Sequence, residues 1–342
     1  NYVHYATRGG ILLWAEPGQW ATRTNSVVRN NRLYRNAMVG IEFHGRNHLV
    51  EGNEVWRTIQ YHPNWSPAPG YADADGMRFF GSGHVVRLNY IHDITYDDPE
   101  NVNPHIDCFQ TWNADYQEGG NNILFERNQC EVLETQTAHE SGNAFMLAGA
   151  YNLTIRNNLL RAFKHINVAG GGCHHITIVN NTFTSDLSFP TSNFPVGLDL
   201  ENSPYVTAKN NVFYNLPGNV YYVTGTSSQG LDISHNVAYR SDGLAPEGSP
   251  YANDLWGVDP QFEDAASNNY HLRSTSPAVD SGTDMAGIVV DDFYGAARPQ
   301  GGGYDRGMCE YGGGSQPTPT PPVSYTHLRA HETVLDLVCR LL

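Results

Sequence analysis

Short hydrophobic runs, each interrupted by asparagine, recur along most of the chain. Each run holds four to six residues, is rich in β-branched and aromatic side chains, and is bounded by Asn and Gly. Helices need about ten or more residues with a 3.6-residue period, whereas short β-branched runs between turn residues are typical of strands. The repeated segments are SVVRNNRLY (26–34), HLVEGNEVW (48–56), HVVRLNYIH (84–92), ILFERNQCE (123–131), LTIRNNLLR (153–161), ITIVNNTFT (176–184), VTAKNNVFY (206–214) and LDISHNVAY (231–239).

One asparagine anchors each repeat, and successive anchors lie 22 to 39 residues apart. A period of about 20 to 50 residues indicates a solenoid. Asparagine tolerates the left-handed backbone of a sharp corner between strands, and amides stacked at equivalent corners can hydrogen-bond from coil to coil. We therefore predict an all-β protein, a right-handed parallel β-helix of about eight or nine coils. The anchors are Asn31, Asn53, Asn89, Asn128, Asn158, Asn181, Asn211 and Asn236.

The repeat and the C-terminal region together resemble a known group of proteins. The asparagine-anchored coils over residues 25–241 are similar to those of secreted bacterial β-helix proteins of the pectate-lyase-like superfamily. Two further segments resemble C-terminal endings in that group, DPQFEDAASNNYHLRSTSPAVDSGT (259–283) and DDFYGAARPQGGGYDRGMCEYGG (291–313). The resemblance implies the β-helix fold, but lyases, hydrolases, epimerases and binding modules all use this fold, so the activity stays open.

We divide the chain into four regions from its repeats, from the resemblance and from its composition. The repeats give 1–249 (the β-helix, with inserted loops at 61–76 and 95–120), the resemblance implies a C-terminal cap at 250–313, and the composition predicts a linker at 314–323 and a non-native tail at 324–342. The linker is rich in Pro and Thr, which predicts an extended, semi-rigid segment. Such linkers join modules of extracellular polysaccharide-degrading enzymes, so we expect a partner module. The tail differs in composition from the rest of the chain, and we assign it no function.

The charge of the chain narrows the range of partners. It has 35 acidic and 20 basic residues, a formal net charge of −15, and Lys164 and Lys209 are its only lysines. This balance disfavours nucleic acid and anionic membrane surfaces as partners. No run of 18 apolar residues is present that would span a bilayer. We expect a secreted, extracellular monomer that requires no cofactor.

Cysteine spacing does not identify a metal site. The chain has five cysteines, with neither a CxxC pair nor zinc-like spacing. We interpret Cys108, Cys130 and Cys173 as small buried core residues, with a disulfide as the alternative.

Two long insertions are the places where ligand chemistry is expected. Long loops on a solenoid commonly line its binding face, and neighbouring coils lie about 4.8 Å apart. Tryptophan in a Pro- and Asn-rich loop is not readily core, and exposed rings suit the apolar faces of sugars. We predict ligand contacts from Tyr61, Trp65, Tyr71, Phe80, His105, Asp107, Trp112, Tyr116 and Glu42.

Alternation along the strands that lead into the loops predicts a polar stripe on one face. If Ile41 and Phe43 point inward, Glu42 and His44 point outward, because successive side chains of a strand alternate. The same argument predicts that further side chains face outward from their strands. A shift of the strand by one residue would reverse the facing of each of them. These are Arg78 and Phe80; His105, Asp107 and Phe109; His165 and Asn167; and Asp199 and Glu201. The predicted stripe is Glu42, Arg78, Asp107, His165 and Asp199.

Several reactions remain open for this surface. A hydrolase needs two carboxyl groups about 5 to 9.5 Å apart, for which Asp107 with Asp73, Asp75 or Glu140 is a candidate. A uronate lyase or epimerase would need cationic groups, and Arg78 or His105 would have to serve. Asp73 and Asp75 are candidate calcium ligands through their carboxylate oxygens, although Asp is also common in turns.

We favour a non-catalytic function over these reactions. The acidic charge, the scarcity of lysine and the Pro/Thr linker point to a module that binds a neutral plant glycan. In architecture and linker the chain resembles the β-helical xylan-binding modules of bacterial xylanases, so the resemblance implies a xylan-like ligand. If the protein is an enzyme instead, the catalytic candidates are Asp107, His105 and Arg78.

Overall fold

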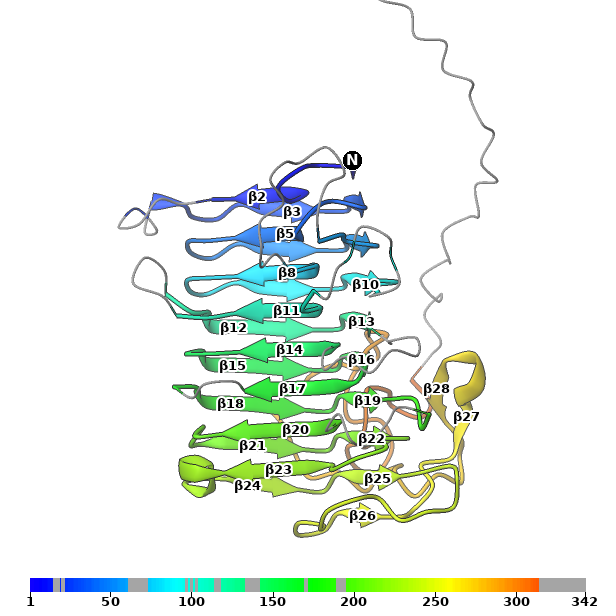
Figure 1. The fold of residues 1–342 in the computed structure, drawn as a ribbon. Helices are drawn as coiled ribbons and strands as arrows, with labels where there is room; N and C mark the ends of the chain where they lie inside the picture. The colour runs from blue at the N-terminus through cyan, green and yellow to red at the C-terminus, as the bar shows by residue number, and fades with distance from the viewer. Residues whose placement is uncertain are drawn as a thin grey trace, which may run out of the picture.

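The computed structural model shows a stack of β-coils, each running through three parallel sheets (Figure 1). The first and second sheets have eight strands each and the third has ten, so eight coils carry all three strands. The predicted parallel β-helix of eight or nine coils is confirmed. The structure describes residues 1–14, 19, 22–60, 73–95, 98, 101, 104–113, 118–132, 142–168, 172–188 and 195–313.

Strands are short in all three sheets. The first sheet consists of β2 Ile11–Leu13, β5 Val39–Phe43, β8 Asp75–Phe79, β11 Asp107–Thr111, β14 Asn143–Leu147, β17 Lys164–Val168, β20 Val196–Glu201 and β23 Tyr221–Thr224. The second sheet consists of β3 Val27–Arg29, β6 Leu49–Glu51, β9 Val85–Arg87, β12 Asn121–Glu126, β15 Tyr151–Arg156, β18 His174–Val179, β21 Val206–Lys209 and β24 Asp232–Ser234.

The third sheet completes each coil. It consists of β1 Tyr2–His4, β4 Arg32–Tyr34, β7 Glu54–Trp56, β10 Tyr90–His92, β13 Gln129–Val132, β16 Leu159–Ala162, β19 Thr182–Thr184, β22 Val212–Tyr214, β25 Val237–Tyr239 and β26 Leu255–Trp256. A separate antiparallel pair is β27 Phe262–Asp264 with β28 Asn269–Leu272, and the two 3₁₀ turns are η3 Gly225–Ser228 and η4 Ala265–Ser267. None of the described residues forms an α-helix, so none forms a helix that would cross a membrane.

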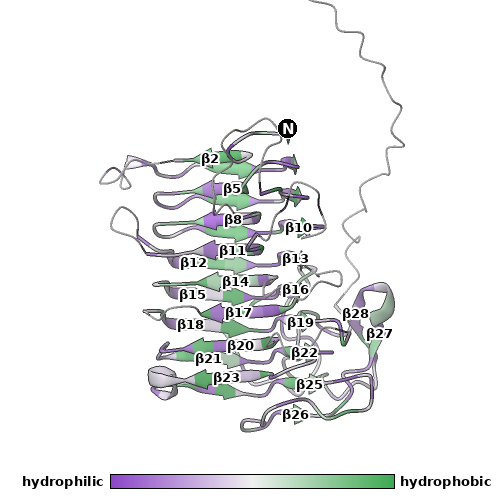
Figure 2. Ribbon diagram, viewed as in Figure 1, coloured by the Kyte–Doolittle hydropathy of each residue, from purple (hydrophilic) through white to green (hydrophobic). Residues whose placement is uncertain are grey.

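The interior of the stack is a continuous hydrophobic column. One cluster of buried residues runs from Val28 in β3 to Ala238 in β25. Phenylalanine rings stack from coil to coil inside it, with 4.7 Å between the ring centroids of Phe109 and Phe145 and 4.8 Å between those of Phe183 and Phe213. Hydrophobic and hydrophilic residues mix within the strands (Figure 2), as expected when one side of each strand faces a core.

The anchor asparagines form the hydrogen-bonded ladder that their spacing predicts. In each coil the backbone N–H and the side-chain amide donate to Oδ1 of the next anchor; Asn158 does so to Asn181 at 3.0 and 2.9 Å. The same pattern joins all eight anchors. Asn1 donates to the first anchor, and the last donates to Oδ1 of Asp254. The ladder therefore extends beyond the repeats recognised in the sequence.

The left-handed corner falls one residue earlier than expected. The residue before each anchor has positive φ, for example 54° at Asn30, 52° at Asn157 and 54° at Asn180, whereas the anchors do not. In each NN pair the first asparagine therefore turns the chain, and the second satisfies buried backbone groups. This division explains why the first position also accepts Gly52 or Leu88.

Residues 257–313 pack along the flank of the coils. Corner asparagines hold them there: the side-chain amides of Asn157 and Asn180 donate to the carbonyl oxygens of Asp291 at 2.7 Å and Asp305 at 2.8 Å. A second hydrophobic cluster joins this segment to the third sheet. Because β26 pairs with β25, the stack continues past residue 249.

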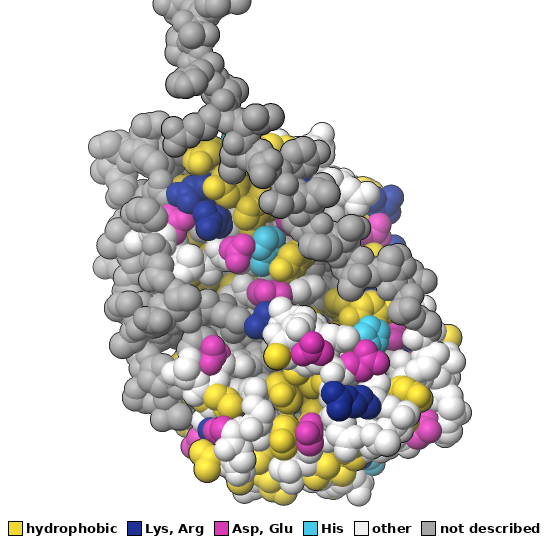
Figure 3. Space-filling model, turned by 90° about the vertical axis from the view of Figure 1, so that its right-hand side faces the viewer, with side chains coloured by type: hydrophobic (Ala, Val, Ile, Leu, Met, Phe, Trp, Pro, Cys, Tyr) yellow, Lys and Arg dark blue, Asp and Glu magenta, His cyan; other side chains and the backbone are white. Residues whose placement is uncertain are grey.

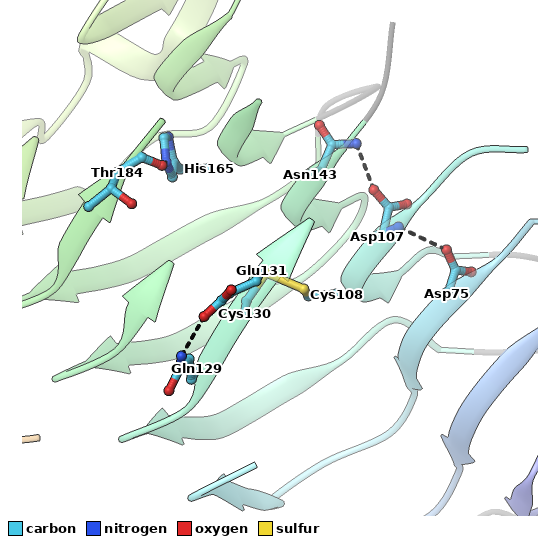
Figure 4. The surroundings of a disulfide bond; sticks show 9 residues. All are labelled: Asp75, Asp107, Cys108, Gln129, Cys130, Glu131, Asn143, His165 and Thr184. Atoms are coloured by element: carbon cyan, nitrogen blue, oxygen red, sulfur yellow. Dashed lines mark hydrogen bonds between the residues drawn. A yellow bond between two sulfur atoms is a disulfide. The ribbon is translucent and has the colours of Figure 1, made fainter. Parts of the chain in front are cut away.

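Two of the cysteines are bonded to one another. All three cysteines expected in the core are buried, and Cys173 is free, but Cys108 and Cys130 form a disulfide between β11 and β13 (Figure 4). Our preferred interpretation of this pair as core thiols was wrong. Alternation gave no indication of the bond because Cys108 and Cys130 lie on different sheets and meet only across the interior. A disulfide is consistent with an extracellular protein.

Candidate functional site

The outer face of the first sheet carries a row of mainly polar side chains. Strand register aligns Leu12, Glu42, Arg78, Gln110, Met146, Asn167, Asp199 and Tyr222 across the eight strands. Glu42, Arg78 and Asp199 are members of the predicted stripe, and their outward facing is confirmed. Ile41 and Phe43 are fully buried, also as predicted.

Two residues that were predicted to face outward point into the interior instead. Phe109 lies in the core, and Gln110 takes the outward place beside Arg78. His165 is fully buried, and its Nε2 lies 2.8 Å from the carbonyl oxygen of Thr184. Both predictions were wrong because these strands do not alternate strictly.

Two consecutive residues point inward near the start of each of these strands. A Cβ placed on Gly76 would lie 2.6 Å from Cγ2 of Ile91 in the core, and the next residue, Met77, is also core. In β11 the corresponding pair is Cys108 and Phe109. Side chains on either side of such a pair both face outward, so they lie three residues apart instead of two.

This irregularity creates a second outward row, in which Asp107 occupies the centre. Its backbone N–H donates to Oδ1 of Asp75 at 3.1 Å, and its Oδ1 accepts from the amide of Asn143 at 2.6 Å (Figure 4). Asp107 faces outward as predicted, yet it is only 1% exposed. Asn143, which the sequence analysis missed, belongs to the site. Its signal was the position of an Asp or Asn two residues before a core Met or Phe, shared by Asp75, Asp107 and Asn143.

Arg78 is enclosed by carboxylates and an aromatic ring. Its Nε lies 2.7 Å from Oδ2 of Asp75, and its Nη2 lies 3.1 Å from Oδ2 of Asp73. The guanidinium carbon lies 5.5 Å from the centroid of Trp112, a cation–π distance. The positive charge of Arg78 is therefore paired with carboxylates of the protein itself. Asp73 is partly exposed, and His105 approaches it, with Nδ1 3.7 Å from Oδ1.

The protonation of Asp107 is unusual for a carboxyl group. Burial raises its pKa to about 7, repulsion from Asp73 adds to the rise, and the hydrogen bond from Asn143 opposes it. Burial also raises the pKa of Asp75, with the charge of Arg78 opposing. Strongly shifted carboxyl groups gather at functional sites more often than elsewhere.

Aromatic rings border this carboxyl cluster. The rings of Phe80 and Trp112 meet edge to face at 4.8 Å, and the ring of His44 lies 4.6 Å from Phe80. Phe80 is 1% exposed and so lies beneath its neighbours, whereas Trp112 is partly exposed. Glu42 contributes its carboxylate to a 2.7 Å contact with Nε2 of His44.

The remaining predicted site residues lie outside the described residues. These are Tyr61, Trp65, Tyr71, Tyr116 and Glu140. Among the described residues no group of three or more His, Cys, Asp or Glu is arranged to hold a metal ion. Calcium at Asp73 and Asp75 stays a prediction; Arg78 already occupies one oxygen of each.

No protein-family model matches the chain, and no curated protein is detectably similar to it in sequence. Among solved structures, pectate lyase Pel9A matches with 15% identity and a TM-score of 0.45, covering 91% of this chain and 69% of its own. A pectate lyase bound to a hexasaccharide matches with 16% identity and a TM-score of 0.34, covering 77% and 65%. These low scores transfer no activity, and the fold assignment stands on the three parallel sheets.

Proposed function

We propose that the outer face of the first sheet binds a neutral polysaccharide, of the xylan type found in plant cell walls. The observation that carries this proposal is the pairing of the cations on that face. Arg78 is bound by two carboxylates, and Nζ of Lys164 lies 3.7 Å from Oδ2 of Asp199. A polyuronate needs cations that are available to its own carboxylates, and neither of these described cations is.

The balance of charge on this face points the same way. Among the residues of this face that the structure describes, the outward carboxyl groups are Glu42, Asp73, Asp75, Asp107, Asp199 and Glu201, against the two cations named above. A polyanion approaching this surface would be repelled. On the flank that lies at the right of Figure 1, basic side chains lie among acidic and hydrophobic ones (Figure 3).

The composition of the surface suits sugar hydroxyl groups and C–H faces. Trp112 offers an aromatic ring that is partly exposed, and Gln110 and Asn167 lie on the outward row with amide groups. Sugars stack on such rings and hydrogen-bond to amides and carboxylates. The Pro/Thr-rich linker supports the further proposal that the β-helix is one module of a larger secreted protein.

Polysaccharide binding in solution tests this function. Wild-type protein is measured by calorimetry against xylan, mannan, β-glucan and polygalacturonate at low and high salt. Trp112→Ala is expected to weaken binding of the preferred neutral glycan by about 1 to 3 kcal/mol, the range for loss of an aromatic anchor. Tyr311→Ala, which removes a ring that is 43% exposed in the C-terminal segment, serves as the matched control.

Salt dependence separates the neutral glycan from a charged one. Binding of a neutral chain should change little with salt, because no ion pair with the ligand is formed. A preference for polygalacturonate that falls steeply with salt would contradict the proposal. Equal affinities of wild type and Trp112→Ala would contradict the assignment of the surface.

A further inference from the structure

Two buried polar atoms on the proposed binding surface have no described partner. They are Oδ2 of Asp107 and Oε1 of Gln110, in residues that are 1% and 3% exposed. Buried polar atoms in proteins are nearly always hydrogen-bonded, so each exception calls for an explanation. Both residues face outward from the same strand, β11, next to Arg78. Their placement indicates a position for a polar group of a ligand.

The carboxyl groups beside these atoms differ in their environment. Asp73 and Asp75 each accept a hydrogen bond from Arg78, whereas Asp107 accepts one from the neutral amide of Asn143. Asp75 uses both of its oxygens, one for the backbone N–H of Asp107 and one for Arg78, whereas only Oδ1 of Asp107 accepts a hydrogen bond. Asp107 is thus the one of these three carboxyl groups without a cationic hydrogen-bond partner, and burial raises its pKa to about 7. Carboxyl groups with such divergent environments are the usual acid and base of a hydrolytic site.

We propose that this surface also hydrolyses the neutral glycan it binds, with Asp107 as the proton donor and Asp73 as the base that activates water. In the reaction the bond between the anomeric carbon and the glycosidic oxygen breaks, and the proton of Asp107 passes to that oxygen. The hydroxyl of one water molecule bonds to the anomeric carbon, and the other proton of that water passes to Asp73. One water is consumed, no oxidant or reductant is needed, and proton exchange with solvent restores both carboxyl groups.

The neighbours of these two groups fit the assigned roles. The side chain of Asp73 is 24% exposed, so water can reach it, and Nη2 of Arg78 and Nδ1 of His105 lie 3.1 and 3.7 Å from its oxygens. Asn143 and Asp75 act as positioning residues, because they hold Oδ1 and the backbone N–H of Asp107 and leave Oδ2 for the substrate. The proposal rests on the proposed function, since it uses the same surface and the same substrate class.

The test combines binding and product release on the same neutral polysaccharides. Wild-type protein is expected to release new reducing ends without unsaturated products, at a rate that falls as the pH rises through about 7, where Asp107 loses its proton. Asp107→Asn and Asp73→Asn should each lower kcat/KM about 100-fold or more while the dissociation constant changes less than about threefold. Asp232→Asn, which alters an exposed carboxylate on β24, is the matched control and should retain full activity.

Each outcome has a distinct meaning. Glycan binding without any new reducing ends would overturn the hydrolase inference and leave the proposed function standing. Absence of binding to every neutral glycan would refute the proposed function and this inference together. Unsaturated products, or full turnover by Asp107→Asn, would overturn the assigned mechanism. Should the Asp107 variant fail to fold, the pH profile of the wild type decides, because a rate that stays constant or increases above pH 7 excludes Asp107 as the proton donor.

Discussion

Removal of one anchor amide gives the most direct test of what holds the coils together. Asn158 lies in the middle of the ladder and is fully buried. Its Oδ1 accepts from the backbone N–H of Asn128 at 2.9 Å and from the Asn128 amide at 3.1 Å. Its own amide donates to the carbonyl oxygen of Phe125 at 3.1 Å and to Oδ1 of Asn181 at 2.9 Å. Asn158→Ala removes all of these bonds and no charge.

The cost follows from the groups that the substitution leaves behind. The buried N–H of Asn128 loses the acceptor supplied by the side chain, and the carbonyl of Phe125 loses a donor. Each orphaned buried group costs about 1 to 3 kcal/mol, so two of them predict a loss of about 2 to 6 kcal/mol in the free energy of unfolding. The amide of Asn128 keeps a second partner, the carbonyl oxygen of Val86, and adds little to the loss.

Urea unfolding followed by circular dichroism measures this difference. The control is Asn152→Gly, which removes an exposed amide from the same coil; glycine is chosen because φ there is 51°. The control should change stability by no more than about 0.5 kcal/mol, as surface substitutions do. A midpoint for Asn158→Ala equal to that of the control, with an unchanged slope, would refute the role of the ladder.

Three further predictions concern the disulfide, Asp107 and His165. Replacing Cys108 and Cys130 together by Ala opens a covalent link across 22 residues and should lower stability by about 3 kcal/mol, measured by the same unfolding assay against Cys173→Ala. Burial raises the folded-state pKa of Asp107 to about 7, so the contribution of this group to stability becomes less favourable as the pH rises from about 4 to 7. Asp107→Asn should therefore gain stability relative to wild type between pH 4 and 8. A stability difference between the two proteins that stays constant over this range would contradict the prediction. The pKa of buried His165 is lowered to about 4, so protonation of the unfolded chain should destabilise the wild type as the pH falls from about 6.5 to 4, and His165→Gln should lose part of that dependence.

The fold could be predicted from the sequence because every coil repeats one physical requirement. A corner residue with positive φ and a buried amide follow one another in each repeat, and short β-branched runs flank them. These signals are local, and eight copies reinforce one another. The sequence did not show which asparagine of each NN pair forms the corner and which one provides the buried amide, because asparagine suits both positions.

The candidate site was predicted only in part, for a physical reason. Outward facing of Glu42, Arg78 and Asp199 followed from alternation, but the facings of Phe109 and His165 did not. Alternation fails where two consecutive side chains enter the core, as Cys108 and Phe109 do. The ion pairs of Arg78 could not be predicted from the sequence either, because they depend on how close the fold brings two carboxylates to its guanidinium group.

The disulfide and the buried carboxyl group of β11 stand on consecutive residues. Cys108 points inward, as alternation from an outward Asp107 requires, and there it meets Cys130 of β13. The residue immediately before it, Asp107, consequently faces outward, onto the row that contains Asp75 and Asn143. A covalent bond one residue away fixes the backbone of Asp107, and a fixed backbone is what a buried carboxyl with an unoccupied oxygen needs to stay in position. The departure from alternation acts on the next residues, because Phe109 enters the core and Gln110 then faces outward beside Arg78.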